Sequence, residues 1–126
     1  MRPYIADLFR RMRDPDPREQ DEAFDAVLFE REKAVPDLVA GYTRFSDDTL
    51  LRFFAVQLLG FSGSPDAVGT LVEALDDKDP IIRGEACRSL EDLRATDAVP
   101  GLRARLQDVD ANVREAAREA LSALGR

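Results

Sequence analysis

The chain has 126 residues, 44% of them hydrophobic and 34% charged, a composition typical of one soluble globular domain. It carries 25 acidic against 18 basic residues, a net charge of −7, which argues against nucleic acids and anionic membrane surfaces as ligands because cations dominate binding to both. The chain has no histidine and a single cysteine, so His-dependent triads and His- or Cys-rich metal sites are excluded.

No glycine-rich phosphate-binding motif is present either. We therefore expect no catalytic residue, no cofactor and no metal ion. The first residues do not resemble a signal peptide, no apolar run is long enough for a membrane span, and a lone cysteine is typical of a reducing compartment. The sequence predicts a cytoplasmic protein.

Helix starts are marked along the whole chain. An Asp-Pro pair at 16–17, a Ser-Pro pair at 64–65 and an Asp-Pro pair at 79–80 each place an N-capping side chain before a proline at the first helical position. Between such signals the apolar residues recur at helical spacing, and no segment alternates as a strand does. The pattern predicts eight helices, over residues 3–13, 17–30, 35–45, 48–61, 65–76, 80–94, 98–107 and 110–124.

The chain is built from an internal repeat of about 31 residues. One pattern, with Asp first, then Arg, Ala and Leu at fixed positions, recurs at 48–59, 79–90 and 110–121. A second pattern, Ala-Val-x-x-Leu, recurs at 34–38, 67–71 and 98–102. Fixed periods of this length indicate stacked repeats. The sequence predicts a single all-α domain over 1–126, a right-handed α-solenoid of four antiparallel helix pairs near 1–31, 33–62, 65–95 and 97–126.

The combined pattern, AVPxLxxxL followed by DxDPx[VI]RxxAxxxL, resembles the short HEAT repeats of phycobilisome-lyase-type proteins. The third and fourth units match it best, and the first is recognisable mainly from its neighbours. The resemblance implies a solenoid whose second helices line the concave face. It also implies that the repeated Asp and Arg residues tie successive repeats together, which we favour over a ladder of phosphate-binding arginines. These structural residues are Arg52, Asp77, Arg83, Asp108 and Arg114.

This ladder weakens toward the N-terminus, where Gln20 takes the Arg position and Ser46 replaces the Asp before Arg52. We expect a less rigid interface between the first two units.

The outward positions of the second helices form the candidate binding surface. The second unit places Leu50, Phe53 and Phe54 there, and Ile81 of the third unit extends them into an apolar patch. An exposed apolar cluster inside a charged rim is typical of a protein-binding site. The alternative is that Phe53 and Phe54 pack within their own repeat. The remaining candidates are polar: Asp21, Glu22, Asp25, Gln57, Glu85, Arg88, Glu115 and Glu119.

The sequence therefore predicts a scaffold without catalytic activity that binds another protein on its concave face. Because the surface is acidic, we expect a partner that presents apolar anchors together with basic residues. The alternative function is a HEAT-like subunit of an enzyme complex such as a chromophore-lyase-type assembly. Polar outer positions on the first and last helices predict a monomer, and a homodimer formed through Phe53 and Phe54 is the alternative.

Overall fold

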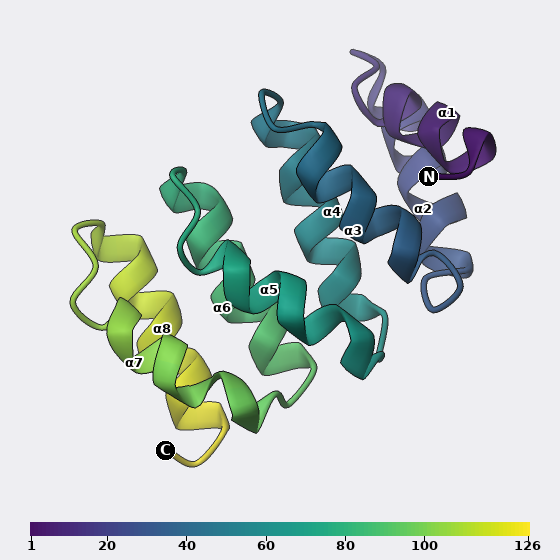
Figure 1. Cartoon of the computed structure of the whole chain (residues 1–126). Coiled ribbons are helices and arrows are strands. Elements are labelled where there is room, and N and C mark those ends of the chain that lie inside the picture. The colour runs from purple at the N-terminus through teal and green to yellow at the C-terminus, as the bar shows by residue number, and fades with distance from the viewer.

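The structure is a computed structural model that describes residues 1–126, and all of its regular structure is helical (Figure 1). The elements are α1 (Pro3–Met12), α2 (Pro17–Phe29), α3 (Val35–Arg44), α4 (Thr49–Phe61), a 3-10 turn (Pro65–Ala67), α5 (Val68–Ala74), α6 (Pro80–Asp92), a second 3-10 turn (Thr96–Ala98), α7 (Val99–Arg105) and α8 (Ala111–Ala123). The eight predicted helices are confirmed. The fifth and seventh begin later than predicted because a 3-10 turn forms their first residues.

Helix boundaries follow the capping chemistry of the sequence. The carboxylates of Asp16, Asp48, Asp79 and Asp110 each accept a hydrogen bond from a backbone N–H in the first turn of α2, α4, α6 and α8. Gly63 follows α4 with a φ of 68°, a conformation that glycine adopts without steric cost. These local signals define where each helix pair begins and ends.

The helices form two layers. In Figure 1, α3, α5 and α7 lie in front, and α4, α6 and α8 lie behind them. The second helices pack extensively on one another, α4 on α6 and α6 on α8, whereas contacts between successive first helices are sparse. Because the second-helix layer is the more tightly packed, the stack curves toward it. The resemblance implies that this more tightly packed second-helix layer lines the concave face.

The repeated Arg and Asp residues connect neighbouring repeats. Arg83 donates to both carboxylate oxygens of Asp108, at 2.9 and 3.0 Å, and to the backbone carbonyl of Asp77 at 2.9 Å. One repeat earlier, Arg52 pairs with the Asp77 carboxylate. Arg114 donates to the backbone carbonyl of Asp108 at 2.7 Å. Arg83 and Arg114 thus join the turn of their own repeat, and Arg52 and Arg83 reach the next repeat.

The interface between the first two repeats lacks this ion pair. Gln20 retains only the contact within its own repeat, donating from its amide to the backbone carbonyl of Asp14 at 2.7 Å. Phe24 of α2 instead meets Phe54 of α4 edge-on, with ring centroids 5.7 Å apart. The packing of α2 on α4 is less extensive than that of α4 on α6, and Figure 1 shows α1 and α2 turned relative to the other pairs.

The core runs through the stack between the two layers, and its largest fully buried side chains include Phe9, Leu38, Leu58, Ile82 and Leu102. Cys87 is part of this core, and burial raises the pKa of its thiol to about 12, so it stays protonated at neutral pH. None of the helices combines the length and the apolar character that crossing a bilayer requires.

Candidate functional site

The second-helix face carries the residues that the sequence singled out, but not all of them are exposed. Leu50, Ile81 and Arg88 are exposed, and Gln57 is half-buried. The predicted carboxylates at the two ends of the face are also exposed, namely Asp21, Glu22 and Asp25 on α2 and Glu115 and Glu119 on α8.

The expectation of an exposed pair of phenylalanines needs correction. Phe53 and Phe54 are both half-buried and pack against the core. Phe54 turns toward the first repeat and fills the α2–α4 interface against Phe24, where the Arg–Asp pair is missing. Phe53 contacts Phe54, with ring centroids 6.0 Å apart, and its other side faces α6. Of the two rings, Phe53 is the one that contributes to the open surface.

Glu85 is also placed differently from the prediction, because it is only 8% exposed. The reason is that α6 is packed on both sides, by α4 and by α8, so a narrower strip of its surface reaches solvent. Burial raises the pKa of the Glu85 carboxyl, and the nearby Arg88 guanidinium, 3.7 Å away, opposes this only in part.

We expect Glu85→Gln to stabilise the protein at neutral pH and to have no such effect in acid. A carboxyl whose pKa is raised by folding favours the folded state below its unfolded pKa of about 4.3, and this contribution is lost as the pH rises through the folded pKa. The measurement is the urea midpoint of both proteins at pH 7.5 and pH 4. Glu119→Gln, on the exposed surface of α8, is the control; equal midpoints for Glu85→Gln and wild type at pH 7.5 would contradict the expectation.

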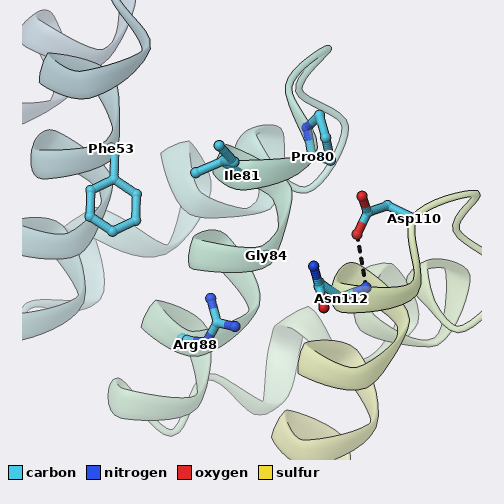
Figure 2. Close-up of a pocket in the computed structure, with 7 residues that line it drawn as sticks. All are labelled: Phe53, Pro80, Ile81, Gly84, Arg88, Asp110 and Asn112. Atoms are coloured by element: carbon cyan, nitrogen blue, oxygen red, sulfur yellow. Dashed lines mark hydrogen bonds between the residues drawn. The ribbon is translucent and has the colours of Figure 1, made fainter.

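A hollow of about 210 Å³ opens on this face across α4, α6 and α8. Its apolar side is formed by Phe53 of α4 and by Pro80 and Ile81 at the start of α6. Figure 2 shows the Ile81 side chain pointing toward Phe53, with Gly84 one turn further along α6. Ile81 is 59% exposed because no segment of the chain covers it. The hollow therefore has an accessible apolar wall.

The other side of the hollow is polar. Asp110 and Asn112 approach it from the start of α8, and Arg88 reaches up toward Gly84 from the next turn of α6 (Figure 2). Oδ1 of Asp110 accepts the backbone N–H groups of Asn112 and Val113 at 2.8 and 3.1 Å, which holds the carboxylate at the rim.

The charged residues that line the hollow are one carboxylate, Asp110, and one guanidinium, Arg88, whereas the helices of this face are mainly acidic. Carboxylates of α2, α6 and α8 outnumber the exposed arginines of these helices, and Arg118 is already paired with Glu115. Burial raises the pKa of the Asp92 carboxyl, as it does that of Glu85. No group of three or more His, Cys, Asp or Glu side chains is arranged to hold a metal ion.

The sequence predicted no hollow on this face, and Pro80 and Asp110 entered the prediction only as parts of helix starts. A signal was available: Gly84 lies inside a helix at a position where the other repeats carry Asp21, Phe53 and Glu115. The prediction also missed Phe29 and Phe61, exposed aromatic residues one turn beyond the predicted surface at the ends of α2 and α4. Their helical spacing from Asp25 and Gln57 was the signal for them.

Stacked helix pairs with a tightly packed second-helix layer define an α-solenoid repeat protein. The sequence over 35–122 matches the HEAT repeats family, and the chain belongs to this family. The match begins at the second helix pair, in agreement with the weaker pattern of the first. No curated protein matches the chain significantly.

Solved structures show the same fold. The complex of CpcE and CpcF of phycocyanin lyase from Nostoc sp. PCC7120 is similar over 96% of this chain, with 26% identity and a TM-score of 0.69. Human deoxyhypusine hydroxylase is similar over 96% of this chain, with 25% identity and a TM-score of 0.72. An engineered protein, 21% identical, shares the fold over 98% of this chain with a TM-score of 0.60. The chain spans only 53%, 43% and 63% of these three structures.

Proposed function

We propose that the chain is a scaffold without catalytic activity, acting in the cytoplasm, that binds a basic segment of another protein on its second-helix face. The observation that carries this proposal is the hollow across α4, α6 and α8, which combines an accessible apolar wall with the Asp110 carboxylate on a face whose helices are mainly acidic. Apolar side chains at the centre of a surface with a polar rim are the usual source of binding energy between proteins.

Exposure of aliphatic side chains on the second-helix layer supports the apolar part of the proposal. Leu50 is 39% and Ile81 59% exposed, and they occupy equivalent positions of neighbouring repeats. The corresponding residues of the outer repeats are Arg18 and Asn112, which suit a solvated helix. The aliphatic residues therefore occupy the two middle repeats of the stack, near the N-terminal ends of α4 and α6.

The acidic character of this face supports the basic character of the partner. Carboxylates at both ends of the face attract a cationic segment and repel an anionic one, which raises the association rate and excludes acidic partners. Membership of the HEAT repeats family and the likeness to a complex of two proteins agree with a protein partner.

We expect Ile81→Ser to weaken binding of selected peptides about tenfold, because it removes the most exposed aliphatic side chain of the face. The probes are linear peptides enriched from a random displayed library on the wild-type chain, and their affinity is measured by fluorescence anisotropy. Val72→Ser on α5, in the opposite layer, is the matched control and leaves the affinity unchanged.

The selected peptides are expected to combine aliphatic or aromatic residues with Lys or Arg. A library that yields no enriched peptide, an acidic consensus, or equal affinity for wild type and Ile81→Ser overturns the proposal.

A second candidate function is a HEAT-like subunit of an enzyme complex such as a chromophore-lyase-type assembly. The likeness to the CpcE–CpcF complex over nearly the whole chain, at about half the length of the matched structure, favours it. Such a subunit forms a stable complex with another folded chain. Co-purification of one stoichiometric protein partner that free peptides do not displace would support this function over the first.

A further inference from the structure

The hollow is centred on Gly84, a glycine that helix packing does not require. Glycine is among the least favourable residues in a helix interior, so its presence there calls for a structural explanation. At Gly60 the reason is close packing, because an added Cβ would lie 2.8 Å from the Cα of Ser89. At Gly84 an added Cβ would meet only Nη1 of Arg88, at 3.6 Å, an ordinary contact with a flexible side chain. The feature that a side chain at this position would remove is the hollow itself.

Alignment of the repeats also indicates that Gly84 is linked to the hollow. The positions equivalent to Gly84 in the other helix pairs are occupied by Asp21, Phe53 and Glu115. In the third repeat alone this position has no side chain, so a gap opens between Phe53 on one side and α8 on the other. The gap lies beside Ile81, the most exposed aliphatic residue of the face.

A second, independent feature is an unused carboxylate oxygen at the rim. In each of α4, α6 and α8, Oδ1 of the capping aspartate accepts from the backbone of its own helix. Oδ2 of Asp48 accepts from the Arg13 guanidinium, and Oδ2 of Asp79 accepts from the Thr49 hydroxyl at 3.0 Å. Oδ2 of Asp110 accepts from no side chain, although Asp110 lines the hollow.

The missing donor has a simple cause in the sequence. Thr49, which serves Asp79, is replaced one repeat later by Pro80, which has neither a hydroxyl nor a backbone N–H. Asp110 therefore keeps a negative charge with one oxygen free, next to the apolar surface of Pro80 and Ile81. A Lys or Arg side chain of a ligand is the donor that best fits such an oxygen on an acidic face.

The size of the hollow limits its occupant. A volume of about 210 Å³ is below the 300–1,000 Å³ that is usual for pockets that enclose small molecules. It suits one side chain of a linear segment, with the rest of the segment lying along the face. The hollow has Phe53 and Ile81 on one side and Asp110 on the other. A partner that contacts both sides must carry an apolar side chain and a cation close together.

We propose that the Gly84 hollow is the anchor site of a basic linear peptide, receiving one aliphatic side chain against Phe53 and Ile81 and one Lys or Arg side chain on Oδ2 of Asp110. This inference rests on the proposed function and adds the recognition elements to it. Arg88 is the one cation at the hollow, is half-exposed, and is opposed by the Glu85 carboxyl. An entering aliphatic side chain displaces the Arg88 guanidinium, whose Nη1 would lie 3.6 Å from a Cβ added at Gly84.

The test uses the full chain and fluorescein-labelled peptides enriched on the wild type. Gly84→Leu fills the hollow and is expected to weaken binding about tenfold or more. Gly69→Leu on α5, where no atom lies within 4 Å of an added Cβ, is the matched control with the same gain in helix propensity. Its affinity stays at the wild-type value. Circular dichroism establishes that both variants are folded.

The cation site is tested by Asp110→Asn, which keeps a good helix cap but removes the charge. It is expected to weaken binding about fivefold and to reduce the salt dependence of the affinity, and to have no effect on a peptide whose Lys or Arg residues are replaced by Ala. Arg88→Ala is expected to strengthen binding, because it removes a like charge.

Three results would overturn the inference: wild-type affinity of Gly84→Leu, wild-type affinity of Asp110→Asn, or weaker binding by Arg88→Ala, which would indicate an anionic ligand. These results leave the proposed function standing if Ile81→Ser still loses binding, because the peptide then lies on the same face outside the hollow. If no peptide is enriched at all, the proposed function and this inference both fail.

Discussion

Asp108→Ala is expected to lower the free energy of unfolding by about 3–5 kcal/mol, because it leaves a buried arginine without its partner. The Asp108 side chain is 1% exposed and that of Arg83 11%, and two hydrogen bonds of 2.9 and 3.0 Å join them across the third and fourth repeats. Asp108 also accepts from Arg105 at 3.1 Å and from the backbone of Asp110 at 2.9 Å. Urea unfolding followed by circular dichroism measures the loss.

An exposed ion pair is the control for this experiment. Glu115→Ala removes the partner of Arg118 on the surface of α8 and is expected to cost less than about 1 kcal/mol. Combining Asp108→Ala with Arg83→Met removes both charges and should recover part of the loss, since the stranded guanidinium is then absent. A loss no larger for Asp108→Ala than for Glu115→Ala would contradict a stabilising role of the ladder.

The loss of stability caused by Asp108→Ala is expected to depend on pH. Hydrogen bonds from Arg83 hold the pKa of Asp108 below its usual value, more than compensating for burial. A carboxyl whose pKa is lowered by folding contributes stability above its unfolded pKa of about 3.9, and that contribution is lost as the pH falls through the folded pKa. The difference between wild type and Asp108→Ala is therefore expected to be full at neutral pH and to shrink in acid.

Gly60→Ala is expected to lower the free energy of unfolding by about 1–3 kcal/mol, the usual range for overpacking. An added Cβ would lie 2.6 Å from the Cβ and 2.8 Å from the Cα of Ser89, so the backbones of α4 and α6 must separate. The hydrogen bond from the Ser89 hydroxyl to the carbonyl of Val56, 3.0 Å long, lies in the same contact and weakens with it. Thermal and urea unfolding measure the change.

The sign of this effect makes it informative. In an open helix position, Gly→Ala stabilises by up to about 1 kcal/mol, and Gly69→Ala, with no neighbour within 4 Å, is expected to do so. If Gly60→Ala stabilises the protein as Gly69→Ala does, α4 and α6 do not approach each other closely at Gly60 and Ser89. Both variants keep the same side-chain chemistry, so only the packing differs between them.

Residues whose role is local were predictable. Asp16, Asp48, Asp79 and Asp110 cap helices through atoms within three residues of themselves, so their positions in the sequence were sufficient. The repeat period then placed the helices in pairs. The absence of the repeated Arg–Asp pair from the first interface was also visible, since Gln20 and Ser46 break the pattern. The HEAT repeats family match confirms the fold that these signals indicated.

The sequence did not predict the exposure of residues that pack against neighbouring repeats. Glu85 and Phe54 occupy outward positions of their own helices, yet α4 and α8 bury the first and Phe24 covers much of the second. A helical sequence pattern predicts the direction in which each side chain leaves the helix axis. How much of that side chain is exposed to solvent depends on the distance to the neighbouring helix.

The sequence by itself therefore determined the helices, their caps, their pairing into four repeats and the acidic character of the chain, because each depends on contacts between residues close in sequence or on composition alone. Only the tertiary structure decided which outward positions remain open. The hollow at Gly84 and the free oxygen of Asp110 arise from residues of three repeats brought together by packing, and their shape depends on helix separations that the repeat pattern does not encode.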